Sequence, residues 1–252
     1  MKRPMQTMGE YRTQITRLTH ALARAQHGDI LKGMNSAGGT ARVKLFTDGN
    51  LDKRFLKLKD LLEYAADGFE DLDDRIARFV QTMPLQPYDS NCSDSERFLD
   101  WLSAEYALTD GERDCVTCQR SRNAVEQLAE ENRLPHVRFQ EICSVSPGLA
   151  PAWGTEGVVL LHPNPIHVAA TFHTRELLDE EDDVPASVMF FPVGNEVRTA
   201  VLEEEGRRIA AALKNAGPLR FDDLAAVEPS LDRETLVEVS RDLAEVGLAA
   251  FA

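Results

Sequence analysis

The stretch SVMFFPVGNEVRTAV, residues 187–201, decides how the second half of this chain folds. Two runs rich in β-branched and aromatic residues, 187–191 and 196–201, flank Val193-Gly194-Asn195. A Gly-Asn pair between such runs is typical of a β-hairpin, because glycine and asparagine tolerate the positive φ angles of a tight turn. We therefore predict two antiparallel strands joined by a short turn.

Further apolar runs and helical patterns lie on both sides of this hairpin. Before it, two apolar runs predict strands over 157–161 and 166–172, and the prolines of His162-Pro163-Asn164-Pro165 keep the segment between them out of a helix. After it, apolar spacing and stop signals predict a helix from Leu202 to about 215, helices over 221–227 and 231–246, and a last strand over 248–251. Short strands followed by three helices are the outline of a winged helix.

The first part of the chain is predicted to be largely helical. Two capping boxes, Ser93 with Glu96 and Thr109 with Glu112, mark helix N-termini, and each cap stabilises its helix by about 1 kcal/mol. The other predictions for this part are helices over 10–31, 51–66 and 69–83, a flexible loop over 33–40, a short strand over 42–46, a turn over 48–50 and a short helix that starts at Pro135.

The predicted fold class is α+β, with an N-terminal helical domain and a C-terminal winged-helix-like module. Residues 1–146 form the mainly helical domain, and residues 157–252 form the winged-helix-like, peptide-recognition domain. The segment 147–156 between them holds two prolines and two glycines, which disfavour both a helix and a regular strand. We therefore predict a linker over 147–156.

The charge balance restricts the partners of this chain. It carries 28 Lys and Arg against 42 Asp and Glu, a formal net charge of −14, which argues against nucleic acid and anionic membranes as partners. A DNA reader would lay the predicted helix over 231–246 in the major groove. DNA phosphates would repel its five acidic residues, which two arginines do not balance, so we do not expect nucleic acid on this helix. These are Asp232, Glu234, Glu238, Asp242 and Glu245.

No targeting signal is visible in the sequence. No stretch approaches the roughly 20 apolar residues that a membrane span needs, and no apolar segment follows the first residues as in a signal peptide. The prediction is a cytoplasmic protein. The 4 cysteines do not make a disulfide framework in a chain of 252 residues.

Cys115-Val116-Thr117-Cys118 is the first group that could carry chemistry. A C-x-x-C motif can be redox-active or can supply half of a zinc site. Here it falls inside the helix that Thr109 caps, more than a turn from the helix N-terminus, and no second pair has finger-like spacing. Structural cysteines on a helix are therefore the favoured interpretation, and a metal or redox protein using Cys115 and Cys118 stays an alternative.

The histidines and the acidic segment form the second group. His162, His167 and His173 cluster around two predicted strands, where they could bind a metal, contact a partner or lie on the surface. The segment 176–183 carries six carboxylates, among them Asp179 and Glu180, without the spacing of a calcium loop. It is interpreted as a solvated loop or as a docking surface for a basic partner.

The sequence lacks a nucleophile elbow, a His-Glu-x-x-His motif and a dinucleotide fingerprint, which favours a recognition role over catalysis. Three stretches, 158–163, 187–201 and 243–248, together with the helical Phe98-Leu99-Asp100-Trp101-Leu102, resemble in pattern and order the partner proteins of multinuclear non-haem iron-dependent oxidative enzymes. Those partners join a helical domain to a winged-helix-like precursor-recognition element. Residues 1–50 depart from that pattern.

This resemblance implies a non-catalytic subunit that binds a ribosomally made precursor peptide and presents it to the iron-dependent enzyme. The chain itself would hold no cofactor, and the iron would belong to the partner enzyme. The peptide would add as a strand beside 196–201 and pack against the third helix, which is β-augmentation. The implied peptide-binding residues are Glu196, Val197, Arg198, Thr199 and Val201 on the edge, with Leu236, Val239, Ser240 and Leu243 in the groove.

Three of the groove residues have a second interpretation. Leu236, Val239 and Leu243 are equally well explained as plain core. The candidates for contact with the partner enzyme are His162, His167, His173, Asp179 and Glu180. Besides the metal or redox protein, a winged-helix transcription regulator is the other alternative function, and the acidic third helix argues against it.

Overall fold

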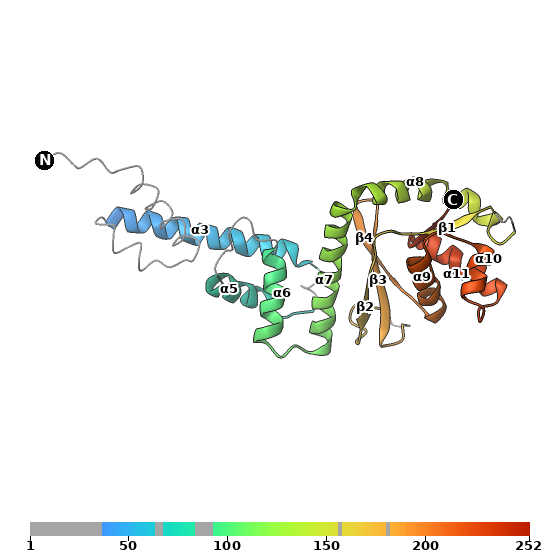
Figure 1. Cartoon of the computed structure of the whole chain (residues 1–252). Coiled ribbons are helices and arrows are strands. Elements are labelled where there is room, and N and C mark those ends of the chain that lie inside the picture. The colour runs from blue at the N-terminus through green and yellow to red at the C-terminus, as the bar shows by residue number, and fades with distance from the viewer. Residues whose placement is uncertain (1–36, 64–67, 84–92, 156–157, 180–181) are drawn as a thin grey trace, which may run out of the picture. The chain divides into compact units, whose positions relative to one another are not determined.

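The computed structural model describes residues 37–63, 68–83, 93–155, 158–179 and 182–252 (Figure 1). The chain divides into two compact units, residues 1–108 and 109–252. The helix predicted over 10–31 lies outside the described residues. The division falls earlier in the chain than the predicted linker over 147–156, so the helices that follow Thr109 belong to the same unit as the strands.

The first unit is built from helices. They are α3 (Ala37–Leu61), α5 (Leu72–Thr82) and α6 (Asp94–Glu105). The buried faces of α5 and α6 carry apolar residues, and the rings of Phe79 and Phe98 meet edge to face with centroids 5.3 Å apart. The Ser93 hydroxyl accepts a hydrogen bond from Glu96 N at 3.1 Å, as the predicted cap requires.

Three predictions in this unit are wrong. The predicted loop over 33–40, in its described part, the strand over 42–46 and the turn over 48–50 all fall in α3. A short apolar run does not distinguish a strand from a helix segment by its periodicity. Gly49 in a helix interior costs only about 1 kcal/mol relative to alanine, too little to end the helix.

Two long helices open the second unit. They are α7 (Asp110–Glu131) and α8 (Arg133–Leu149), followed by the 3-10 turn η1 (Ala150–Ala152). The predicted capping box at Thr109 is confirmed: Glu112 N donates to the Thr109 hydroxyl at 3.2 Å, and Thr109 N donates to the Glu112 carboxylate at 2.8 Å.

The hairpin predicted around Gly194 is confirmed and forms part of a three-stranded antiparallel sheet. Its strands are β2 (Val168–Phe172), β3 (Ala186–Val193) and β4 (Glu196–Val201), with β3 in the centre. Successive side chains of β3 face opposite sides of this sheet. Val188 and Phe190 pack with residues of α7, whereas Met189 and Phe191 join the core of the C-terminal helices, so the central strand β3 is buried on both faces. Figure 1 shows this sheet between α7 and the C-terminal helices.

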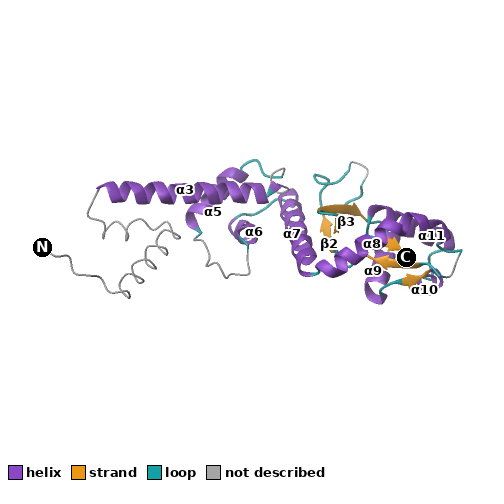
Figure 2. Cartoon of the chain, turned by 90° about the horizontal axis from the view of Figure 1, so that it is seen from above, coloured by secondary structure: helices purple, strands orange, loops and turns teal. Residues whose placement is uncertain are grey.

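The C-terminal helices close on a second small antiparallel sheet (Figure 2). The helices are α9 (Glu204–Ala216), α10 (Phe221–Val227) and α11 (Arg233–Val246), and the strands are β1 (Leu160–Pro163), β5 (Leu219–Arg220) and β6 (Ala249–Phe251). In this sheet β1 lies between β5 and β6. The order α9-β5-α10-α11-β6 is that of a winged helix, and its third strand is supplied by β1, from before the hairpin. The α+β fold class is thereby confirmed.

The segment predicted as a linker is instead part of this core. Helix α8 continues through Pro147, and η1 follows it without a break. The Ser146 hydroxyl accepts a hydrogen bond from Phe251 N at 2.8 Å, and Trp153 is 1% exposed beside the rings of Phe221 and Phe251. Tertiary contacts to β6 therefore outweigh the local preference of proline and glycine against helix.

Candidate functional site

The outer edge of β4 presents unpaired backbone groups. Leu202 N donates to Ser187 O at 2.8 Å, which fixes the alternation of hydrogen-bonded pairs between β3 and β4. The backbone N–H and C=O groups of Val197, Thr199 and Val201 consequently point away from β3. Among the described residues this edge has one hydrogen-bond donor beside it, the Arg122 guanidinium of α7, which reaches Val197 O at 2.9 Å.

The side chains of β4 alternate between the two faces of its sheet. Val197 packs with the α7 cluster, and Ala200 packs with the core of the C-terminal helices. Arg198 shares the face of Ala200 and is exposed. The edge residues Glu196, Thr199 and Val201 are also exposed, so the strand is accessible to a second chain along its outer side.

A pocket of about 690 Å³ lies next to this strand. Helix α8, the tip of the β3–β4 hairpin and the C-terminal half of α11 form its walls. Arg198 of β4 is also part of its lining. Its volume falls within the range of about 300–1,000 Å³ that is usual for ligand pockets. Its apolar lining includes Phe139, Val193, Ala244 and Phe251, and its charged lining includes Arg198, Arg241 and Glu245.

Helix α8 holds the hairpin tip in place at this pocket. Gln140 Nε2 donates to Gly194 O at 3.1 Å, and His136 Nε2 lies 3.3 Å from the same carbonyl oxygen. Gly194 takes the positive φ of 63° that the tight turn requires. The wall of the pocket is therefore fixed by contacts between segments far apart in the sequence, which no local pattern predicts.

The groove residues predicted on α11 do not line this pocket. Leu236, Ser240 and Leu243 are 1%, 0% and 3% exposed, and they form the stripe of α11 that faces the core. Val239 packs against α9, where a Cβ placed on Gly206 would lie 3.9 Å from Val239 Cγ1. The pocket uses the other side of the helix, with Arg241, Ala244 and Glu245. In this structure the side chains of Leu236, Val239 and Leu243 therefore pack in the core, as the alternative interpretation predicts.

The predicted histidines have separate surroundings. His162 lies on β1 opposite Ala250, and burial lowers its pKa. His167 Nδ1 lies 3.1 Å from Asn164 O, and burial is also the main cause of its lowered pKa. His173 is exposed just after β2. Among the described residues, no group of three or more His, Cys, Asp and Glu side chains could hold a metal ion.

The acidic segment is only partly described. Asp179 is exposed, and its backbone N–H donates to the Asp182 carboxylate at 3.1 Å. Glu180 lies outside the described residues. Contact of these two residues and the histidines with a partner enzyme stays a prediction.

Helix α7 holds the edges of the hairpin sheet through two side chains about two turns apart. Arg122 bonds the start of β4, as described above, and the Asp114 carboxylate accepts from His173 N at 2.9 Å and Thr174 N at 2.7 Å at the end of β2. Asp114 is 1% exposed, and no local sequence pattern indicates this role. Its partners lie about sixty residues further along the chain.

The cysteine pair lies on the buried side of α7. Cys115 is 0% and Cys118 is 6% exposed. Burial raises the pKa of the Cys118 thiol, against the opposing effect of Arg122. Because the thiolate is the reactive and metal-binding form, this environment disfavours redox or ligand chemistry at Cys118.

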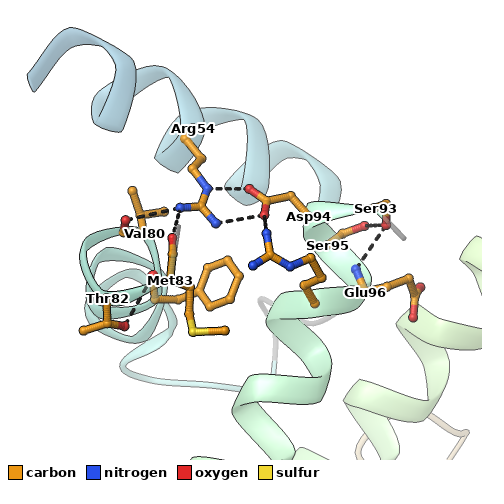
Figure 3. Close-up of polar contacts among 10 residues, drawn as sticks. Arg54, Val80, Thr82, Met83, Ser93, Asp94, Ser95 and Glu96 are labelled. Carbon is orange, nitrogen blue, oxygen red and sulfur yellow. Dashed lines mark hydrogen bonds and ion pairs between the residues drawn. The ribbon is translucent and has the colours of Figure 1, made fainter. Parts of the chain in front are cut away.

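The first unit has a polar cluster of its own, centred on Arg54 (Figure 3). The Arg54 guanidinium of α3 pairs with both oxygens of Asp94, at 2.8 Å for Nη2 to Oδ1, and donates to Val80 O at 3.2 Å and to Met83 O. It also lies over the ring of Phe79, with Cζ 4.9 Å from the centroid. Arg54 therefore joins the C-terminal end of α5 to the N-terminus of α6, which is a structural role.

Comparisons of the chain with protein-family models, with curated proteins and with solved structures found no match. None of the described helices combines the length and the apolar composition that would be needed to cross a bilayer.

Proposed function

We propose that this chain is a non-catalytic subunit that binds a ribosomally made precursor peptide and presents it to an iron-dependent oxidative modifying enzyme. The observation that carries the proposal is the accessible outer edge of β4 beside a pocket bounded by α11. The resemblance of residues 158–163, 187–201 and 243–248 to the partner proteins of such enzymes supports the same assignment. In this proposal the iron belongs to the partner enzyme, and the chain acts in the cytoplasm.

The peptide would bind by strand addition. The N–H and C=O groups of Thr199 and Val201 would pair with its backbone, and each such hydrogen bond contributes about 0.5–1.5 kcal/mol. Backbone pairing is independent of sequence, so specificity would come from side chains that enter the adjacent pocket. Recognition of this kind needs no catalytic group in the subunit itself.

The test of strand addition is a proline in the edge. Thr199→Pro removes an outward N–H of β4, and Thr171→Pro is the matched control, because the register places the Thr171 N–H on the outer edge of β2. The full chain and both variants are co-expressed with the products of the neighbouring genes, and peptide, enzyme and iron in the purified complex are measured. We expect Thr199→Pro to lose the peptide and Thr171→Pro to keep it.

Two results would contradict this function. Recovery of the wild-type chain alone, without peptide or enzyme, would refute the proposed function. Iron or zinc bound by the isolated chain would favour the metal-protein alternative, with Cys118→Ser as its control.

A further inference from the structure

The pocket beside β4 carries positive charge in a strongly acidic chain. Arg198 and Arg241 line it together with Glu245, although the chain as a whole has a formal net charge of −14. Within the part of the chain that the structure describes, the guanidinium of Arg198 has no hydrogen-bond or ion-pair partner. Arg241 makes one long contact, from Nη2 to Ala150 O at 3.4 Å. Both guanidinium groups can therefore donate hydrogen bonds to a carboxylate of a ligand.

The apolar part of the pocket lies close to these arginines. Phe139 of α8 and Phe251 of β6 are 4% and 0% exposed, and Val193 and Ala244 complete an apolar wall. Such a wall would bury a bulky aliphatic or aromatic side chain. Burial of one such side chain typically contributes about 1.5–3 kcal/mol.

Strand geometry determines how a peptide could use both features. Alternate residues of a strand face the same side of a sheet, so a strand added to β4 would direct every second side chain towards the face of Arg198. Two side chains separated by one residue would then enter the region of the pocket together. One could fill the apolar part while its neighbour on the same face meets the arginines.

From this arrangement we infer that the site selects an extended peptide segment in which an acidic residue and a bulky apolar residue are separated by one residue. The acidic side chain pairs with Arg198 and Arg241, and the apolar side chain occupies the pocket against α8. This inference rests on the proposed strand addition at β4 and names the peptide class that this site accepts. Helix α8, which lies outside the winged-helix-like order of elements, is then part of the specificity.

The experiment selects short random peptides, displayed on phage, against the immobilised full chain. The variant Arg198→Glu/Arg241→Glu reverses the charge of the pocket, and Arg138→Glu/Arg220→Glu makes the same change in net charge at exposed arginines outside the pocket lining. Thermal unfolding checks that both variants fold. We expect the wild type and the control to enrich the acidic and apolar pair, and the charge-reversed variant to replace the acidic residue with a basic one. A peptide enriched on the wild type should bind the reversed variant at least about tenfold more weakly.

The outcomes separate this inference from the proposed function. Enriched peptides without a charge preference, or with the same preference on the reversed variant, would overturn the inference and leave peptide binding intact. Absence of enrichment on all three proteins would also overturn it, and the co-expression experiment would then decide independently whether the chain binds a peptide.

Discussion

At the scale of single residues, Asn164 connects the two sheets of residues 109–252. It is 1% exposed and lies between β1 and β2. Its Nδ2 donates to Pro192 O at 3.3 Å and to Gly247 O at 3.0 Å, and its Oδ1 accepts from Ile166 N at 3.0 Å. One amide thus satisfies three backbone groups from three parts of the chain.

Asn164→Ala is expected to lower the free energy of unfolding by at least about 2 kcal/mol, because it leaves buried backbone groups without partners, each at a cost of about 1–3 kcal/mol. Chemical denaturation followed by circular dichroism measures the change. The control is Asn215→Ala, which removes an exposed amide near the end of α9. Equal stability of the two variants would show that Asn164 is not needed to join the sheets.

Arg54 has a comparable role in the first unit. Arg54→Met keeps an unbranched apolar stem but leaves two carbonyl groups without their donor, and it leaves the Asp94 carboxylate with Arg97 as its remaining partner (Figure 3). We expect a loss of about 2 kcal/mol or more and reduced amide protection in α5 and α6, measured by hydrogen exchange. Lys57→Met, at an exposed position of the same helix, is the control, and similar exchange in both variants would contradict this role.

At the scale of elements, local patterns were sufficient where a segment has strong signals of its own. The predicted strand over 196–201 and helix over 221–227 have the observed bounds of β4 and α10. Local sequence patterns gave wrong predictions where contacts between residues distant in the sequence determine the structure of a segment. Pro147 and Gly154 indicated a linker, but the bond from Phe251 N to Ser146 and the burial of Trp153 keep this segment in the core.

The candidate site also combines features that the sequence predicts with features that depend on distant contacts. The free edge of β4 follows from the strand order and was predicted together with Arg198 and Thr199. The wall that α8 contributes depends on contacts of Gln140 and His136 with Gly194, more than fifty residues away, which no local pattern encodes. Helix periodicity identified one stripe of α11, but it could not show whether a peptide or the core covers that stripe.

The end of α11 supplies a prediction at this scale. Gly247 ends the helix in the left-handed region with φ 92°, and a Cβ there would lie 3.0 Å from Val193 Cγ2 at the hairpin tip. Gly247→Ala should lower the free energy of unfolding by about 1–2 kcal/mol, because an L-residue is strained in this conformation.

The control for Gly247→Ala is Gly148→Ala in α8, where the added methyl group meets no atom within 4 Å apart from the adjoining residues and the backbone of its own helix. In a helix this change stabilises by roughly 0.5–1 kcal/mol, so thermal unfolding should shift in opposite directions for the two variants. A loss of stability in neither variant would mean that the turn after α11 adapts to the methyl group.

At the scale of the whole molecule, the negative charge argues against DNA binding, although the order of elements is winged-helix-like. The exposed side of α11 carries Glu234, Glu238 and Asp242, in a chain with net charge −14. Phosphate contacts supply much of the affinity of DNA-binding proteins, and this surface would repel them.

We expect no binding of duplex DNA by the full chain at low salt, where electrostatic attraction is strongest. Fluorescence anisotropy with a labelled random-sequence duplex measures this. Binding that weakens steeply as salt is added would instead support the transcription-regulator alternative.

The position of β1 between β5 and β6 also governs when the protein can fold during its synthesis. Leu161 pairs with Leu219 on one side and with Phe251 on the other, so this sheet joins a strand that precedes the hairpin to the last strand of the second unit. On the ribosome, β2, β3 and β4 can pair as soon as they emerge, but β1 must wait for β5, and its second partner β6 is complete only when residues 249–251 have been made. Contacts at such long sequence separation form slowly, and until then Leu161 and its neighbours are candidates for chaperone binding.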